Sequence, residues 1–334
     1  MQQADCQDLT ECLRIFSGSS HPELAQEIAD YLGCPLCPSH TERFSNDNLF
    51  VQLGESVRGK DVVIIQSFSP DVSDNIFELL MMLDAARSAS AKTIHAVIPY
   101  FSYGRSDKKD QPRISITGRL VADLLATAGA SHVMTMTLHS PQVHGFFSVP
   151  TDHLTSHHVF ARHFLSRDLS NTVVLAPDIG AAKRAAKLAR ALGVSVAAGD
   201  KERLSDDTVR IEGIIGDIRG KDVIIFDDEI ATGGSTLGII NVLRQSDVTH
   251  ITLACTHGVF SGPAIERLSA IPEIDEIVTT NTVPIPEHKR LPNMTILSIA
   301  PIFGEAIRRN VMGKSVGALF AYWPDALEME YSGY

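Results

Sequence analysis

The sequence predicts an α/β protein of two duplicated domains, each a parallel β-sheet flanked by helices. The first observation behind this fold class is an internal repeat, because Val57–Ile65 recurs in the second half of the chain as Ile218–Ile225. The second is that each copy leads from a charged turn into a run of β-branched apolar residues, which is typical of a strand buried on both faces. The third is the order of the elements that follow each copy.

Each copy is followed by a predicted helix and then by another apolar strand. These are Asn75–Ser88 and Ile94–Pro99 in the first half, and Ser235–Gln245 and Ile251–Cys255 in the second. A strand, a helix and a strand at this spacing form a βαβ unit, which closes right-handed onto a parallel sheet.

The length of 334 residues fits two domains of ordinary size. We predict a first domain over residues 1–150 and a second over 151–334, with the boundary near Pro150. The segment 306–320 is expected to return and pack on the first domain.

The composition excludes several classes of protein. A net charge of −11 argues against a general nucleic-acid binder, which needs a broad basic face to displace counterions. No apolar run approaches the length of a membrane span. The N-terminus carries Asp5, Asp8 and Glu11, where a secretory signal would have positive charge and then an apolar core. We therefore expect a cytoplasmic protein without a nucleic-acid or membrane partner.

An acidic pair and a glycine turn follow the repeated strand only in the second half. Asp227 and Asp228 come directly after the predicted strand Val223–Phe226, and Thr232–Ser235 opens the next helix. In an open parallel sheet, ligands bind beyond the carboxyl ends of the strands. Glycines allow backbone N–H groups to approach an anion, and a helix start carries partial positive charge. The two carboxylates could accept hydrogen bonds from sugar hydroxyls, and the glycine turn beside them could hold a phosphate as a cradle of N–H groups. Together they predict a site for a phosphorylated pentose. The alternative is an ordinary turn with a helix N-cap.

The same residues carry a family resemblance. Val223–Ser235, with the sequence VIIFDDEIATGGS, resembles the phosphoribosyl-diphosphate loop of the type I phosphoribosyltransferase fold. Phosphoribosyltransferases share that loop with the synthetases that make their substrate. Six further segments resemble ribose-phosphate pyrophosphokinases, in the same order along nearly the whole chain: Ile15–His21, Glu55–Asp61, Tyr103–Asp110, Leu138–Phe147, Ala176–Gly180 and Thr256–Pro263.

The resemblance implies a phosphoribosyltransferase-like fold in each domain and the synthesis of phosphoribosyl diphosphate. The 1-hydroxyl of ribose 5-phosphate would attack the β-phosphorus of ATP and expel AMP. Such a transfer depends on alignment and on neutralising the charge of the phosphate chain. The residues implied to bind ribose 5-phosphate are Arg203, Asp227, Asp228, Ala231, Thr232, Gly233, Gly234 and Ser235.

ATP is expected on the first domain. A basic run from Arg105 to Arg113 follows the predicted strand Ile94–Pro99 and so lies at a ligand-facing edge; a solvated charged loop is the alternative. An aromatic side chain before this strand, Phe44, could stack on adenine. The residues that the resemblance assigns to ATP are Phe44, Asn46, Asn48, Arg105, Ser106, Asp110 and His139.

Mg²⁺ is the expected cofactor. His139 and Asp178 each follow an apolar strand, and the resemblance makes both of them contacts of the metal. Without the resemblance, a histidine at this position would more often be structural. Oxygen ligands and retained waters suit Mg²⁺, and a phosphate-rich substrate would complete its coordination.

Lys201 and Arg203 are the implied catalytic residues. They precede the polar stretch Leu204–Thr208, which is predicted to be an exposed loop, and an extended chain would direct both side chains the same way. In the family this segment is a flap whose closure excludes water, while the lysine stabilises transition-state charge and the arginine meets the substrate. From the residues alone, a solvated charged turn is the simpler interpretation.

Four positions depart from the family pattern. Ala231 and Thr137 stand where acidic residues are usual, Ser106 where glutamine is usual, and Asn48 where glutamate is usual. Two other functions are therefore kept open, namely a non-catalytic regulatory homologue and a phosphoribosyltransferase. The presence of the implied catalytic residues and of an intact phosphate cradle favours an active synthetase.

The resemblance also implies an oligomer. Ser56, Arg58 and Arg113 match positions of an allosteric anion site, at which phosphate activates and ADP inhibits in the family. Family members of this length assemble as dimers that stack into hexamers. We therefore expect a homo-oligomer, either a dimer or a hexamer.

Overall fold

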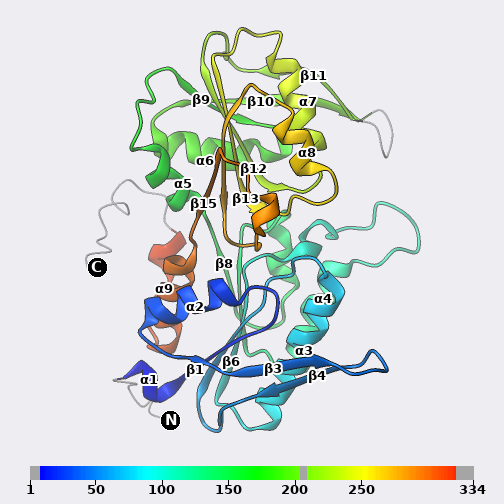
Figure 1. Ribbon diagram of the computed structural model, residues 1–334, viewed down its shortest axis with the longest axis vertical. Coiled ribbons are helices and arrows are strands. Elements are labelled where there is room, and N and C mark those ends of the chain that lie inside the picture. Colours follow the sequence, from blue (N-terminus) through cyan, green and yellow to red (C-terminus); the bar gives the residue numbers. More distant parts are fainter. Residues whose placement is uncertain (1–7, 204–208, 321–334) are drawn as a thin grey trace. The chain divides into compact units, whose positions relative to one another are not determined.

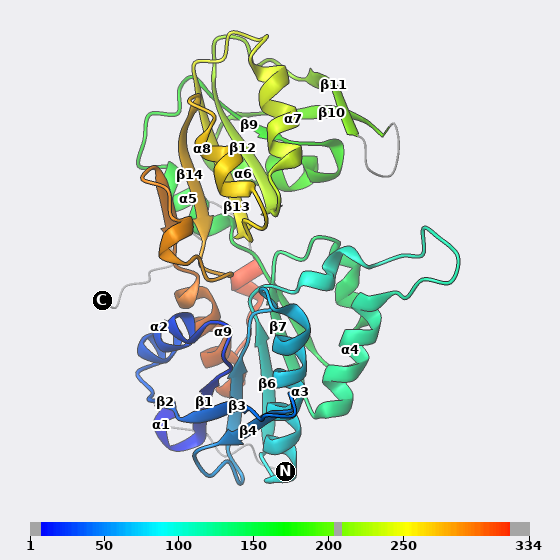
Figure 2. The same ribbon diagram turned by 45° about the vertical axis from the view of Figure 1, so that its right-hand side comes forward.

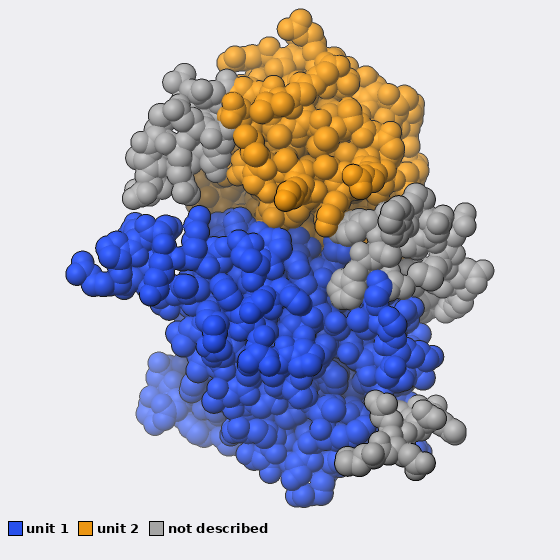
Figure 3. Space-filling view, turned by 180° about the vertical axis from the view of Figure 1, so that it is seen from behind, with its two compact units in different colours: residues 1–155, 282–284, 298–320 blue, residues 156–281, 285–297, 321–334 orange. Residues whose placement is uncertain are grey.

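The structure is a computed structural model that describes residues 8–203 and 209–320. The chain divides into two compact units (Figure 3). Of the described residues, the first unit contains 8–155, 282–284 and 298–320, and the second contains 156–203, 209–281 and 285–297. The division falls after Thr155, whereas the sequence-based boundary lies near Pro150, and the segment 306–320 belongs to the first unit.

The first unit is built on a parallel sheet of six strands in the order β2-β1-β5-β6-β7-β8 (Figures 1 and 2). Helices α2 and α9 pack together on one face of this sheet, and α3 and α4 lie on the other. Strands β3 and β4 form a separate antiparallel hairpin. The strands are β1 (Leu13–Ser17), β2 (Leu36–Cys37), β3 (Ser39–Arg43), β4 (Leu49–Leu53), β5 (Asp61–Ile65), β6 (Thr93–Ile98), β7 (His132–Met136) and β8 (Thr151–Leu154). The helices are α1 (Leu9–Cys12), α2 (Pro22–Leu32), α3 (Val72–Ser88), α4 (Thr117–Ala128) and α9 (Ala300–Val311), with short 3-10 helices η1 (Ser102–Arg105), η2 (Pro141–Phe146) and η5 (Gly317–Phe320).

The second unit has a seven-stranded sheet in the order β11-β10-β9-β12-β13-β14-β15. All neighbouring strands are parallel except β10 and β11, which form an antiparallel hairpin. Helices α5 and α6 cover one face, and α7 and α8 cover the other. The strands are β9 (Thr172–Ala176), β10 (Ser195–Arg203), β11 (Val209–Ile215), β12 (Asp222–Ile230), β13 (His250–Gly258), β14 (Ile274–Thr280) and β15 (Met294–Leu297). The helices are α5 (His157–Phe164), α6 (Ala182–Leu192), α7 (Gly234–Leu243) and α8 (Ala264–Ser269), with 3-10 helices η3 (Ile179–Ala181) and η4 (Glu287–Lys289).

The internal repeat forms equivalent strands of the two sheets. Its apolar runs become β5, which is buried at every residue, and the buried first half of β12. Each of these strands is followed by a helix and by the next strand of its sheet, α3 and β6 after β5, and α7 and β13 after β12. When β11 is left out, the strand order of the second sheet repeats that of the first. The predicted class, two duplicated α/β units with parallel sheets, is confirmed. None of the helices that the described residues form is long and apolar enough to cross a membrane.

A chain of polar side chains crosses the amino ends of four strands in the first unit. Thr93 Oγ1 donates to Asp61 Oδ1 (2.6 Å) and lies 3.1 Å from Nε2 of His95. Nδ1 of His95 is 3.2 Å from Nδ1 of His132, whose Nε2 is 3.2 Å from Oδ2 of Asp152. That carboxylate also accepts a hydrogen bond from α9 (2.8 Å). This row of hydrogen-bonded side chains therefore connects α9 to the sheet.

The buried histidine in this chain predicts a loss of stability in acid. Burial, and next the charge of His132, lowers the pKa of His95 to about 4, against the opposing effects of Asp61 and Asp152. An unfolded histidine binds its proton near pH 6.5, so His95 stabilises the fold above that pH, and this contribution is lost as the pH falls towards 4. We expect the protonation of His95 to lower the free energy of unfolding by about 3 kcal/mol as the pH falls from 6.5 to 4.

Urea unfolding at pH 7 and at pH 4.5 measures this effect. The substitution His95→Gln should make the difference between the two pH values smaller. The same substitution at the exposed His40 is the matched control and should leave the difference unchanged. An equally steep acid loss in His95→Gln would contradict the prediction.

Candidate functional site

The acidic pair lies within β12 rather than after it. The prediction that this strand ends at Phe226 is wrong, because β12 continues to pair with β13 as far as Ile230 opposite Gly258. The amides of Val259 and Phe260 both donate to the carbonyl of Ile230 (3.1 and 3.0 Å), which holds this end of the strand. Asp227 and Asp228 are therefore fixed by the sheet, and the turn itself begins at Ala231.

The turn from β12 into α7 has the geometry of an anion site. Gly233 is the N-cap of α7 and has a φ of 75°, a left-handed conformation that favours glycine. The carbonyls of Ala231 and Thr232 are occupied, because they accept from Ser261 N (2.9 Å) and Arg267 Nη1 (3.1 Å). Within the described residues, no hydrogen bond uses the amide N–H groups of residues 232–235. These donors and the helix start are available to a phosphate.

The acidic pair is held from behind by an arginine of α6. Arg184 forms an ion pair with Asp228, whose side chain is 2% exposed, and its Nη2 lies 3.7 Å from Oδ1 of Asp227. The Asp227 side chain is 24% exposed, and its Oδ1 accepts the amide hydrogen of Asp228 (2.8 Å). Loss of hydration, and next the repulsion from Asp228, raises the pKa of Asp227 well above its usual value, whereas Arg184 lowers it. Arg184 is not among the residues predicted from the sequence. In sequence alone, a Lys–Arg pair at the start of a helix looks like two ordinary charges that face the solvent.

Lys201 and Arg203 lie at the far end of β10. Their backbone is extended, as predicted, and pairs with Ile211 and Val209 of β11. Their side chains are not among those that the structure describes, and the predicted loop Leu204–Thr208 lies outside the described residues. Their catalytic roles therefore stay predictions.

The segment assigned to adenine forms the tip of the β3–β4 hairpin. The amide of Phe44 donates to the carbonyl of Asn48 (2.8 Å), and Oδ1 of Asn46 accepts the amide hydrogen of Asn48 (3.3 Å). The Phe44 ring is 46% exposed and packs on Phe50, with 5.6 Å between ring centroids. An exposed aromatic face at a closed turn is available for stacking.

Arg105 and His139 come from neighbouring segments of the first unit. Arg105 ends η1, and a Cβ placed on Gly104 would lie 3.4 Å from the amide nitrogen of His139. Ser106 has a structural task, because its Oγ accepts the amide hydrogen of Thr117 (3.0 Å) and so caps α4. Asp110 lies in the connection between η1 and α4.

The predicted metal contacts belong to different units. His139 follows β7 in the first unit, and Asp178 follows β9 in the second, where its carboxylate accepts the amide hydrogen of Ala181 (3.0 Å). Across the described part of the chain, no group of three or more His, Cys, Asp and Glu side chains is arranged to hold a metal ion. Mg²⁺ commonly takes most of its ligands from the substrate and from water, so a contact with either residue does not require such a group.

The three residues assigned to an allosteric anion site lie at opposite ends of the first sheet. Ser56 and Arg58 precede β5, and Nη1 of Arg58 donates to Ser90 Oγ (3.2 Å). Arg113 lies in the connection that leaves the carboxyl end of β6. One copy of the chain therefore does not assemble these residues into a single site.

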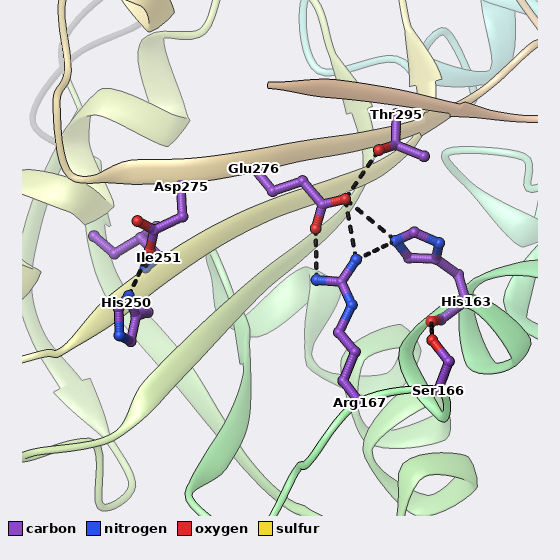
Figure 4. Close-up of polar contacts among 8 residues, drawn as sticks. All are labelled: His163, Ser166, Arg167, His250, Ile251, Asp275, Glu276 and Thr295. Atoms are coloured by element: carbon purple, nitrogen blue, oxygen red, sulfur yellow. Dashed lines mark hydrogen bonds and ion pairs between the residues drawn. The ribbon is translucent and has the colours of Figure 1, made fainter. Parts of the chain in front are cut away.

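A pocket of about 330 Å³ opens at the amino ends of β9, β12 and β13, the opposite end from the glycine turn. Two pairs of its polar side chains bind each other, as Figure 4 shows. Arg167 donates twice to Glu276 (2.6 and 3.0 Å), and Nδ1 of His250 lies 3.0 Å from Oδ2 of Asp275. Because Arg167 is already paired with Glu276, and Asp168 and Asp222 add negative charge to the pocket, the turn after β12 is the stronger candidate for binding a phosphate.

The duplicated parallel sheets, with an acidic pair and a helix-opening glycine turn at one carboxyl edge, define a protein of the phosphoribosyltransferase-like α/β class. Residues 13–129 match the N-terminal domain of ribose phosphate pyrophosphokinase, and residues 208–321 match the phosphoribosyl synthetase-associated domain. The chain belongs to the ribose-phosphate pyrophosphokinase family and is an enzyme.

Individual relatives agree with this assignment over nearly the whole chain. The chain is 53% identical to the ribose-phosphate pyrophosphokinase of Deinococcus radiodurans, covering 92% of this chain and 98% of the relative. It is 45% identical to that of Caldanaerobacter subterraneus, with coverage of 93% and 98%. The crystal structure of phosphoribosylpyrophosphate synthetase from Mycobacterium smegmatis superposes with a TM-score of 0.85 at 39% identity, covering 90% of this chain and 99% of that one.

Proposed function

We propose that this chain transfers the diphosphate of ATP to the 1-hydroxyl of ribose 5-phosphate, which yields phosphoribosyl diphosphate and AMP. The observation that carries the proposal is the turn after β12 at the start of α7, where no hydrogen bond among the described residues uses the amide groups of residues 232–235. These groups would bind the 5-phosphate. Asp227 and Asp228 lie on β12 just before this turn, and they would accept hydrogen bonds from the sugar hydroxyls.

ATP is proposed to bind the first unit, with its adenine against the exposed face of Phe44 and its phosphates near Arg105. Mg²⁺ is the proposed metal, with His139 and Asp178 as its protein contacts and phosphate oxygens and water as its other ligands. When bound, it would neutralise part of the charge on the phosphate chain. Lys201 and Arg203 are proposed to add positive charge at the reacting phosphate.

The reaction is tested by supplying ATP, ribose 5-phosphate and Mg²⁺ and measuring AMP together with phosphoribosyl diphosphate. Both products are expected in equal amounts. A regulatory homologue would form neither of them, and a phosphoribosyltransferase would release pyrophosphate only when a nucleobase and phosphoribosyl diphosphate are supplied. The presence of Lys201 and Arg203 in the sequence, together with the glycine turn at the start of α7, favours the synthetase.

Asp227→Asn should raise the KM for ribose 5-phosphate by about 10- to 100-fold, because a hydrogen bond to a charged group contributes about 1.5–3 kcal/mol. The KM for ATP should change little. Asp222→Asn, at the other end of β12, is the matched control and should leave both constants unchanged. An effect of Asp227→Asn on ATP alone would remove Asp227 from the sugar site.

A homo-oligomer, dimer or hexamer, is proposed as the functional form. Ser56 and Arg58 lie at the opposite end of the sheet from Arg113, so an anion site that uses all three needs residues from more than one copy. Analytical ultracentrifugation with and without phosphate tests this. A monomer under both conditions would contradict it.

A further inference from the structure

The turn after β12 is held on one side by the segment that follows β13. The carbonyl of Ile230 accepts hydrogen bonds from the amides of Val259 and Phe260 (3.1 and 3.0 Å). The next carbonyl, that of Ala231, accepts a hydrogen bond from the amide of Ser261 (2.9 Å). Backbone groups therefore fix the first two carbonyls where the strand passes into the turn.

The third carbonyl is held by a side chain. Arg267 of α8 donates from Nη1 to the carbonyl oxygen of Thr232 (3.1 Å). The next residue of that helix, Leu268, is 1% exposed, and its Cδ2 lies 4.0 Å from the position that a Cβ on Gly233 would take. Helix α8 therefore lies against the turn, with its arginine on the Thr232 carbonyl.

The planarity of the peptide bond turns these contacts into a direction for the amide hydrogens. In a trans peptide, the C=O group and the N–H group of the next residue point in opposite directions. The carbonyls of Ala231 and Thr232 are bound by residues 261 and 267, so the N–H groups of Thr232 and Gly233 point to the other side of the turn. Among the described residues, no hydrogen bond uses these two N–H groups.

We propose that Arg267 is a positioning residue of the phosphate site, which holds the Thr232 carbonyl and thereby directs the N–H group of Gly233 at the 5-phosphate of ribose 5-phosphate. The proposal rests on the function proposed above and adds to it a side chain of α8 that acts without touching the substrate. Gly233 has a φ of 75°. Because glycine is the least restricted residue, the peptide that precedes it needs an outside contact to keep one orientation.

An arginine at this place could instead act through its charge alone, by attracting the phosphate from a distance. The two roles differ in their response to salt. At about 0.5 M salt the screening length is about 4 Å, so attraction through space is largely lost. A hydrogen bond that orients a peptide keeps its effect. The ratio of KM values between a variant and the unchanged chain, measured at low and at high salt, therefore separates the two roles.

The test compares Arg267→Met and Arg267→Lys with Arg244→Met. Arg244 is the C-cap of α7, at the opposite end of that helix from the turn, and it pairs with Glu273 (2.7 Å). Arg267→Met should raise the KM for ribose 5-phosphate by about 3- to 10-fold, the effect of one lost hydrogen bond, and leave the KM for ATP within about twofold. The same factor is expected at both salt concentrations. Arg267→Lys should recover part of the loss, and Arg244→Met should match the unchanged chain.

Thermal unfolding is measured on the same variants. The Arg267 side chain is exposed, so Arg267→Met should unfold close to the temperature of the unchanged chain. A large drop in that temperature with both KM values raised would make Arg267 a structural residue and overturn the inference. An unchanged KM for ribose 5-phosphate, or a loss that disappears at high salt, would overturn it as well. If instead the unchanged chain forms no AMP, the proposed function itself fails, so the two failures are distinguishable.

Discussion

Lys201→Ala is expected to lower kcat by about 10²–10³-fold while the dissociation constant for ATP stays nearly unchanged. In a diphosphate transfer, charge spreads over the oxygens of the transferred group, so a lysine that acts there stabilises the transition state more than the bound substrate. Lys201 lies where β10 extends beyond β9 and pairs only with β11, opposite Ile211. This position at the carboxyl edge of the sheet, where ligands bind in open parallel sheets, supports the role.

Single-turnover kinetics and equilibrium binding of ATP separate the two quantities. Lys221→Ala is a suitable control, because that lysine lies at the amino end of β12 and pairs with Asp217 (3.1 Å). It should keep full activity. A loss of ATP affinity as large as the loss of kcat in Lys201→Ala would show that the lysine binds the ground state.

Gly233→Ala is expected to lower kcat/KM for ribose 5-phosphate by about 5- to 30-fold. With a φ of 75°, a residue carrying a Cβ is strained by about 1–2 kcal/mol, and the turn can relieve that strain by rotating its amides away from the phosphate. Holding the amides in place for the phosphate then costs the strain energy, which corresponds to the expected range.

Gly220→Ala provides the matched control, since Gly220 has a φ of 66° and open space around its Cβ position, at the amino end of β12. Both substitutions should reduce thermal stability by similar amounts. Only Gly233→Ala should impair the use of ribose 5-phosphate, as measured by initial rates at saturating ATP. If the two variants behave alike in the assay, the turn is not the phosphate site.

The glycine turn and the repeat could be predicted because their causes are local. A run of β-branched residues between a charged turn and a helix has one stable environment, a strand buried on both faces, and it occurs at both β5 and β12. Thr232–Ser235 likewise carries its own conformational preference, since glycine adopts positive φ without strain. The extent of β12 could not be predicted, because pairing with β13 carries the strand through Asp227 and Asp228 to Ile230.

Side-chain partners across the fold were beyond prediction for the same reason. The hydroxyl of Ser106 caps α4 through Thr117, and no local pattern distinguishes that task from contact with a nucleotide. The distance between Arg58 and Arg113 follows from the parallel sheet, which places their segments at opposite ends of the strands.

The sequence by itself determined the two duplicated α/β units, the glycine turn that opens α7 and the membership of the family, since each depends on residues that are adjacent along the chain. Only the tertiary structure decided that Arg184 of α6 pairs with Asp228, while Asp227 stays partly exposed. An ion pair between a helix and a strand depends on how their backbones pack. The sequence around either residue therefore does not indicate which residue its side chain contacts.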